Sequence, residues 1–295
     1  MTCLCRLPFF LPTFSCMRNS AQALRPALAA RLPDIPSYLL PGGFDSIGDI
    51  ALLTLPHAIH SAAGRIGEAI LSLHRHIRVV ALRQGNYSGA QRLVRMDVVA
   101  GEERLTTLHR ENGIALFVDL ATVYFSTRLA GERLRLAQQV QAGESVCVLC
   151  SGAGPCLLSI ARHSQAQEIH GIELNEQAHA CAVKNVRLNR CEGRVHLHLG
   201  EAVNTLSLMP YSFDRMVIAL PWNTASLVPA GLAHLRPGGA LHCYAMEENG
   251  QRSRLIEALH SHCTEINRRV EILRSVRCGH CGPDLYRVCH DVIIH

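Results

Sequence analysis

In the second half of the chain, short apolar runs alternate with segments whose apolar residues recur at helical spacing. A helix is predicted over residues 129–140, and further helices over 155–162 and 176–189. The apolar runs predict buried strands at residues 146–150, 169–173, 195–199 and 214–219. Strands that alternate with helices in this way are typical of a parallel, doubly wound sheet covered by helices on both faces. We therefore expect a Rossmann-like α/β domain over residues 121–295.

The first half has a different pattern. A strand is predicted before Pro56, a helix over residues 60–73, and a polar loop at 85–89. Further strands are predicted at 77–82, 92–99, 104–109 and 114–120. Asn112 and Gly113 separate the last two strands, and Asn-Gly tolerates the positive φ angles of a tight hairpin. We therefore expect a small α+β domain over residues 44–120, preceded by an N-terminal extension, residues 1–43, that is partly disordered or a leader.

Length and composition exclude several classes of protein. The chain has 295 residues, of which 48% are hydrophobic and 18% charged, enough for one large core or two modest ones. A disordered or fibrous protein is excluded. The apolar runs are shorter than the ~20 residues that a membrane-spanning helix needs. We expect a cytoplasmic protein, or a mitochondrial one if the Cys-, Phe- and Pro-rich residues 1–16 act as a leader.

Positive charge is concentrated in two segments. Of the 29 basic residues, all except Lys184 are arginine. Residues 1–33 hold four arginines and no acid, and residues 62–95 hold six arginines against Glu68. We expect a polyanion to bind near the second segment. The alternative interpretation is an ordinary solvated face.

The cysteines indicate buried reduced thiols rather than a disulfide framework. Their number, 13, is odd, and several lie within apolar runs. Cys278 and Cys281 have the spacing of half a zinc site or of a redox motif, with Cys289 and His290 as the nearest further ligands. An ordinary turn is the favoured interpretation, and no metal is expected.

Glycine and polar residues follow the strands of the predicted sheet, where such sheets bind ligands. Glu173 ends the second strand, where it can accept hydrogen bonds from two ribose hydroxyls; a helix N-cap or surface acid is the alternative. Glu201 follows the third strand and can equally cap a helix. A dinucleotide fingerprint needs a third glycine where Leu157 stands. The arrangement instead fits class I methyltransferases, which bind S-adenosyl-L-methionine. The residues expected to bind this cofactor are Tyr124, Arg128, Ser151, Gly152, Gly154, Glu173, Leu174, Asn175, Glu201, Ala202, Leu220 and Pro221.

Several motifs occur together in a specific order. They are residues 44–51 (Phe-Asp-Ser-Ile-Gly-Asp-Ile-Ala), 100–102 (Ala-Gly-Glu), 110–113 (Arg-Glu-Asn-Gly), 123–133 (Val-Tyr-Phe-Ser-Thr-Arg-Leu-Ala-Gly-Glu-Arg) and 241–244 (Leu-His-Cys-Tyr). Over residues 44–292 the chain resembles the tRNA guanine-37 N1-methyltransferase family of archaea and eukaryotes. The resemblance implies methyl transfer from S-adenosyl-L-methionine to tRNA. We expect a monomer that binds tRNA and does not associate with a membrane.

The resemblance also implies site residues. Guanine N1 carries a proton, so its methylation needs a base and a group that stabilises charge on O6. Glu132 matches the family's general base and Arg92 the arginine that stabilises O6, with Arg95 as its competitor. Arg128 and Asn223 complete the expected catalytic set. Alternatively, Glu132 forms a structural ion-pair network with Arg128 and with Arg133, the residue that follows it.

The fourth strand end departs from the family. Ala219 stands two residues before Pro221, where the family has asparagine, and Asn223 is the candidate substitute. Lost or altered catalysis is therefore an alternative. The sister branch transfers an aminocarboxypropyl group and has Gly-Asn in place of Arg128-Leu129, so this pair favours methyl transfer. Trp222 either stacks on the target base or covers the cofactor pocket.

Overall fold

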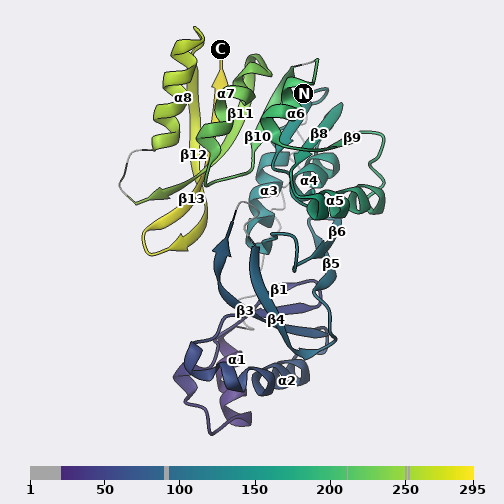
Figure 1. The fold of residues 1–295 in the computed structure, drawn as a ribbon, viewed down its shortest axis with the longest axis vertical. Helices are drawn as coiled ribbons and strands as arrows, with labels where there is room; N and C mark the ends of the chain where they lie inside the picture. Colours follow the sequence, from purple (N-terminus) through teal and green to yellow (C-terminus); the bar gives the residue numbers. More distant parts are fainter. Residues whose placement is uncertain (1–20, 90–92, 211, 250, 252) are drawn as a thin grey trace, which may run out of the picture.

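The computed structural model describes residues 21–89, 93–210, 212–249, 251 and 253–295. The predicted leader, residues 1–16, lies outside this part of the chain. Figure 1 shows an N-terminal domain at one end of the long axis and a larger sheet domain at the other, joined through a two-stranded hairpin. The elements of the hairpin are β5 (Thr106–Glu111) and β6 (Ile114–Asp119).

The N-terminal domain is a sheet of four strands covered by helices. Its elements are α1 (Ala21–Arg31), η1 (Ser37–Leu39), β1 (Asp45–Ile47), β2 (Ile50–Leu53), η2 (His57–Ala62), α2 (Ala63–Leu73), β3 (Val79–Ser88) and β4 (Leu93–Gly101). The strands lie in the order β1-β2-β3-β4, and β2 and β3 are parallel. Every residue of β2 is buried, because one face packs on the helices and the other on the rest of the molecule.

Residues before the boundary predicted at 43/44 pack in one core with the N-terminal sheet and its helices. Leu28 of α1 and Leu40 are fully buried in the same core as Leu53 and Ile66. The segment from residue 24 onward therefore belongs to the N-terminal domain and is not an extension from it.

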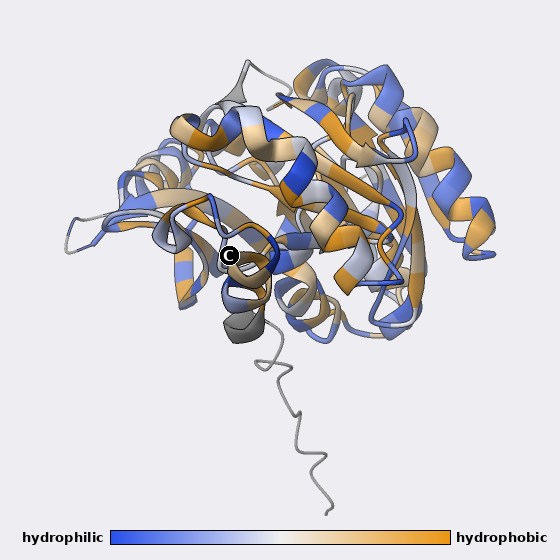
Figure 2. Cartoon of the chain, turned by 90° about the horizontal axis from the view of Figure 1, so that it is seen from below, coloured by the Kyte–Doolittle hydropathy of each residue, from blue (hydrophilic) through white to orange (hydrophobic). Residues whose placement is uncertain are grey.

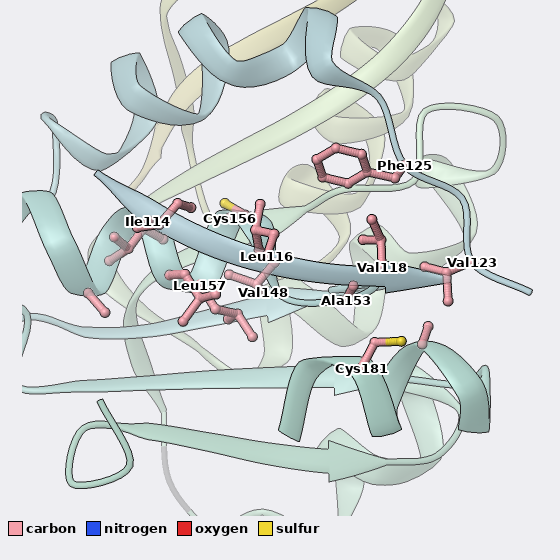
Figure 3. Close-up of a cluster of buried hydrophobic side chains, with 14 of the residues drawn as sticks. Ile114, Leu116, Val118, Val123, Phe125, Val148, Ala153, Cys156, Leu157 and Cys181 are labelled. Atoms are coloured by element: carbon pink, nitrogen blue, oxygen red, sulfur yellow. The ribbon is translucent and has the colours of Figure 1, made fainter. Parts of the chain in front are cut away.

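The β5–β6 hairpin packs with the sheet domain. Asn112 and Gly113 have φ angles of +45° and +74°, which confirms the predicted tight turn. Figure 3 shows Leu116 of β6 in one apolar cluster with Val148 and Leu157 of the sheet domain. Asn185 binds both backbone groups of Phe117, donating to its carbonyl at 2.9 Å and accepting from its N–H at 2.6 Å. The edge of β6 is thus fixed by a helix side chain rather than by another strand.

The sheet domain confirms the predicted α/β fold. Its elements are η3 (Thr127–Leu129), α3 (Ala130–Ala137), β7 (Ser145–Leu149), α4 (Pro155–His163), β8 (Glu168–Glu173), α5 (Glu176–Leu188), β9 (Val195–Leu199), α6 (Ala202–Ser207), β10 (Phe213–Ile218), α7 (Thr224–Ala233), β11 (Leu235–Glu248), α8 (Arg254–Glu265), β12 (Val270–Gly282) and β13 (Leu285–Ile294). The sheet order is β12-β13-β11-β10-β7-β8-β9. The sheet is mixed, because β13 runs antiparallel to both of its neighbours.

Helices cover both faces of this sheet. Val146 and Val148 of β7 belong to the core shared with α4 and α5, whereas Cys147 and Leu149 belong to the core shared with α6, α7 and α8. Figure 2 shows apolar strands inside and helices of mixed polarity around them. A strand buried on both faces needs apolar residues at every position, which is why β7 lacks alternation.

Two local predictions are wrong. Residues 85–88, predicted as a loop, continue β3, which ends at Ser88 before Gly89. Cys278–Cys281, interpreted as a turn, lies within β12 next to its hairpin with β13. Among the described residues, no helix combines the length and apolar character needed to cross a membrane.

Candidate active site

A cleft of about 710 Å³ lies at the carboxyl ends of the parallel strands and extends to the N-terminal domain. It is where the topology of a doubly wound sheet places a ligand. The predicted site residues that line it are Tyr124, Arg128, Glu132, Ser151, Gly152, Glu173, Leu174, Asn175, Glu201, Ala202, Leu220, Pro221 and Asn223. Gly154 does not line it, and Arg92 lies outside the described residues.

The loop after β7 turns sharply through two glycines with different environments. Gly152 has φ +60°, and a Cβ there would meet nothing within 4 Å. Its backbone is therefore open to a ligand in the cleft. Gly154 has φ +83° and is the N-cap of α4, with Ala182 3.5 Å from the position of a Cβ. Gly152 is thus placed for binding, and Gly154 for close packing of the helix.

Glu173 connects the ends of two strands. Its carboxylate accepts hydrogen bonds from the backbone N–H groups of Gly152 at 2.7 Å and Asn175 at 2.8 Å. Asn175, and not Glu173, is the N-cap of α5, so the N-cap interpretation of Glu173 is wrong. Glu201 does cap a helix, because it accepts from the N–H of Asn204 at 2.9 Å at the start of α6.

Glu132 lies in a buried part of the cleft and is only 8% exposed. Arg135 donates to both of its carboxylate oxygens, at 2.6 and 2.7 Å, and the Tyr244 hydroxyl donates to Oε1 at 3.0 Å. Burial raises the pKa of the Cys156 and Cys278 thiols nearby to about 12. These thiols and the Tyr244 phenol are neutral at physiological pH. Arg135 is therefore the charged group that contacts Glu132.

The network predicted between Glu132, Arg128 and Arg133 does not form. Arg133 makes two hydrogen bonds of 2.6 Å to the buried carboxylate of Glu111 on the hairpin. Arg128 donates to both carboxylate oxygens of Asp45 on β1, at 2.9 and 3.0 Å, and so connects the sheet domain to the N-terminal domain. The i+3 neighbour Arg135, which the sequence analysis missed, is the partner of Glu132.

Four arginines of the segment 62–95 are paired with carboxylates that lie outside it. The ion pairs are Arg65–Asp34 at 2.7 Å, Arg78–Glu102 at 2.8 Å, Arg95–Asp97 at 3.0 Å and Arg83–Asp45 at 4.0 Å. The Arg95 side chain is 80% exposed and does not line the cleft, whereas Arg83 does. Arg83 is therefore a cation at the cleft that the sequence analysis missed.

The C-terminal hairpin forms a further wall that was not predicted. Cys278, His280 and Cys281 of β12 and Arg287 of β13 line the cleft. Arg287 donates to the Tyr124 hydroxyl at 3.1 Å. In the described part of the chain, Cys278 and Cys281 are free thiols and join no group of three potential metal ligands. The spacing of residues in the sequence does not indicate that this hairpin reaches the cleft. The hairpin lies there because β13 pairs antiparallel with β11.

The rim of the cleft carries an exposed aromatic ring. Trp222 follows the fourth parallel strand, lines the cleft and is 50% exposed. Ala219 and Asn223 also line the cleft. The side chain of Asn223, at the start of α7, makes no capping hydrogen bond to that helix. The cleft thus combines a glycine loop, an acid at the second strand, a buried carboxylate and a ring at the rim.

Comparisons with known proteins match both parts of the chain. The TRM5/TYW2 methyltransferase domain matches residues 107–273, and the TYW2 N-terminal domain matches residues 24–104. The boundary between the two matches lies directly before β5, the first strand of the hairpin.

The similar proteins act at one tRNA position by two chemistries. The tRNA (guanine(37)-N(1))-methyltransferase Trm5b of Pyrococcus abyssi is 29% identical over 90% of this chain and 80% of its own. A tRNA(Phe) (4-demethylwyosine(37)-C(7)) aminocarboxypropyltransferase of Pyrococcus horikoshii is 26% identical over 91% of this chain and 95% of its own. The solved complex of aTrm5 with tRNALeu has a TM-score of 0.81 at 25% identity, covering 92% of this chain and 78% of that one.

Proposed function

Because the chain belongs to the TRM5/TYW2 methyltransferase family, we propose that it transfers the methyl group of S-adenosyl-L-methionine to N1 of guanosine 37 in tRNA. The observation that carries this proposal is the buried carboxylate of Glu132 in a cleft that also holds a glycine loop and the strand-end acid Glu173. Methylation of a protonated ring nitrogen needs a base at this place, and a nucleoside cofactor needs the loop and the acid.

The cleft fits S-adenosyl-L-methionine on an observation independent of the family match. The open space over Gly152 allows close approach to the backbone, and the Glu173 carboxylate is held beside it. Glu173 would hold the ribose hydroxyls, and Leu174 and Ala202 would contact the adenine. The bound cofactor supplies an electrophilic methyl group.

The reaction then needs residues of the chain to accept the N1 proton and to stabilise the negative charge on O6. Glu132 accepts the N1 proton while the N1–methyl bond forms and the sulfur–methyl bond breaks, and S-adenosylhomocysteine is the by-product. Negative charge that develops on O6 needs a cation or donor. Arg92 is the expected group, and Arg83 is the arginine of the N-terminal sheet that the structure places at the cleft.

Trp222 is placed to receive the target base. An enzyme reaches a ring nitrogen within a stacked loop only after the base is extruded. An aromatic side chain at the cleft rim then replaces part of the lost stacking, worth ~1–3 kcal/mol. The exposure of Trp222 favours this role over that of a cover on the cofactor.

Aminocarboxypropyl transfer is the second candidate. It is favoured by the match of residues 24–104 to the TYW2 N-terminal domain and by the full-length similarity to an aminocarboxypropyltransferase. Against it stands Arg128-Leu129, the pair that resembles the methyltransferase branch. Arg128 is held at the cleft by Asp45. We therefore place methyl transfer first.

The two reactions leave different products from the same cofactor. The test is incubation of the purified chain with S-adenosyl-L-methionine and unmodified tRNA that carries guanosine 37, followed by mass spectrometry of the nucleosides. Methyl transfer gives 1-methylguanosine and S-adenosylhomocysteine. Aminocarboxypropyl transfer, tested on tRNA carrying 4-demethylwyosine, gives methylthioadenosine instead. A tRNA with adenosine 37 is the matched control. If neither product forms while both the cofactor and the tRNA bind, the chain is a tRNA-binding protein that has lost catalysis.

A further inference from the structure

A chain of buried charged groups leads away from Glu132 into the interior of the sheet domain. Beyond Glu132, Arg135 donates to Asp291 of β13 at 2.5 Å. Asp291 contacts Nδ1 of His242 at 2.6 Å, and Nε2 of His242 contacts Arg215 at 2.6 Å. Asp291 is 1% exposed and does not line the cleft. Arg135 is therefore shared between a carboxylate in the cleft and a carboxylate behind it.

The protonation state of His242 follows from its partners. An arginine only donates hydrogen bonds, so Nε2 of His242 accepts from Arg215 and Nδ1 carries the proton that it donates to Asp291. Burial lowers the pKa of His242, which agrees with a neutral ring. Arg274 also donates to Asp291, at 2.6 Å, and to the same Oδ2 atom that accepts from Arg135. Asp291 is thus an anion held by two arginines and one neutral histidine.

His242, Asp291 and Cys289 are also the potential metal ligands that come within 4.8 Å of one another in the described chain. A divalent cation there would face the guanidinium groups of Arg135, Arg215 and Arg274. The arrangement is that of an anion site filled by Asp291, and not that of a metal site.

We propose that Asp291 is a positioning residue for Glu132: it fixes Arg135 from behind and offsets its charge, so that Glu132 is oriented yet remains basic enough to accept a proton. This inference rests on the proposed function for its consequence in catalysis. A carboxylate paired with an uncompensated guanidinium is a weak base, because the cation stabilises the ionised form. When a second carboxylate shares the guanidinium, part of that stabilisation is removed.

The other groups that face Glu132 are neutral or already paired, so Arg135 and Asp291 determine the charge around its carboxylate. The Tyr244 hydroxyl of β11 donates to it, and the thiols of Cys156 on α4, Cys278 on β12 and Cys289 on β13 lie near it. Burial raises the pKa of the thiols and the phenol, so all four are neutral. The neighbouring Arg133 is neutralised by its pair with Glu111.

Two substitutions behind Arg135, one at Asp291 and one at its second arginine partner, should act in opposite directions. Asp291→Asn removes the offsetting charge and should move the acid limb of methyl transfer to lower pH. Arg274→Gln removes a competitor for Asp291 and should move that limb to higher pH. Arg274 is about half exposed, so its substitution preserves the fold even if Asp291→Asn does not. Arg277→Gln is the matched control, because Arg277 lies on the same strand, is exposed and pairs with Asn249.

The readout is the titration of Glu132 itself, followed by NMR in protein labelled with ¹³C at glutamate carboxyls. The Glu132 signal is identified by its absence in Glu132→Gln. Single-turnover methyl transfer from pH 5 to 9 is measured in parallel, where the acid limb should shift with the NMR titration and the plateau of Asp291→Asn should fall about three- to tenfold.

The outcomes separate the two claims. Opposite shifts in Asp291→Asn and Arg274→Gln, with Arg277→Gln unchanged, support the inference. Coincident titrations of all four proteins overturn it, even if the wild type methylates guanosine 37. Opposite shifts in a protein without transferase activity support the charge control by Asp291 and instead overturn the proposed function.

Discussion

The buried pair between Glu111 and Arg133 should be a large contributor to the stability of the cleft wall. The side chains are 5% and 8% exposed, and two parallel hydrogen bonds of 2.6 Å join them. Arg133 follows Glu132 in α3, and Glu111 ends β5. The pair therefore connects the hairpin to the helix that carries Glu132.

Glu111→Gln keeps the shape of this side chain and removes its charge, which leaves a buried guanidinium uncompensated. Breaking a buried pair from one side costs about 3–5 kcal/mol, which corresponds to a fall in Tm of about 6–12 °C at the lower figure. Thermal and urea unfolding measure it. Glu103→Gln, an exposed carboxylate on the preceding loop, should change stability by less than ~0.5 kcal/mol.

A second variant separates charge from packing. The double substitution Glu111→Leu with Arg133→Met replaces both ions by apolar groups of similar size, and should recover most of the lost stability because no buried charge is left alone. If Glu111→Gln is as stable as the Glu103→Gln control, the pair contributes little and the reasoning is wrong. If the double variant is less stable than Glu111→Gln, hydrogen bonding rather than charge balance is the main contribution.

Three further predictions concern cofactor binding, stacking of the target guanine, and stability in acid. Glu173→Gln should weaken S-adenosyl-L-methionine binding about 10- to 100-fold by calorimetry, whereas Glu176→Gln on the outer first turn of α5 should not; equal affinities would remove Glu173 from the site. Trp222→Leu should weaken tRNA binding by ~1–3 kcal/mol without changing cofactor affinity, and a loss of cofactor affinity instead would assign the ring to the cofactor pocket. Burial alone would raise the pKa of Asp291, but hydrogen bonds from His242 and Arg135 outweigh it and lower the pKa. The unfolded chain therefore takes up this proton first as the pH falls below about 4, so the stability difference between wild type and Asp291→Asn should shrink between about pH 5 and pH 3; a constant difference in Tm would contradict this assignment.

Local signals in the sequence predicted the sheet and its binding edge. Strands β7, β8 and β10 are buried on both faces, so continuous apolar runs identified them, and the residues that follow each run lie at the carboxyl edge by topology alone. The Asn112-Gly113 turn was predicted for a similar reason, since its backbone conformation depends on those two residues.

Partners distant in sequence could not be predicted. Arg128 pairs with a carboxylate 83 residues away, and Arg135 with one 156 residues away. Helical spacing suggested neighbours within α3 instead, because only local contacts follow from periodicity. The segment 62–95 was likewise expected to present a strong positive charge, but the fold brings Asp34 and Glu102 against its arginines. Net charge within a segment therefore overestimates the potential at its surface.

The role of Glu132 as the base is the central claim of the account, and Glu132→Gln tests it most directly. Single-turnover transfer of labelled methyl groups to tRNA with guanosine 37 is measured beside cofactor binding by calorimetry. The account predicts that the rate falls about 10²- to 10⁴-fold while cofactor affinity is unchanged, because Glu132 contacts the proton and not the nucleoside. A variant that forms 1-methylguanosine at the wild-type rate would contradict the claim.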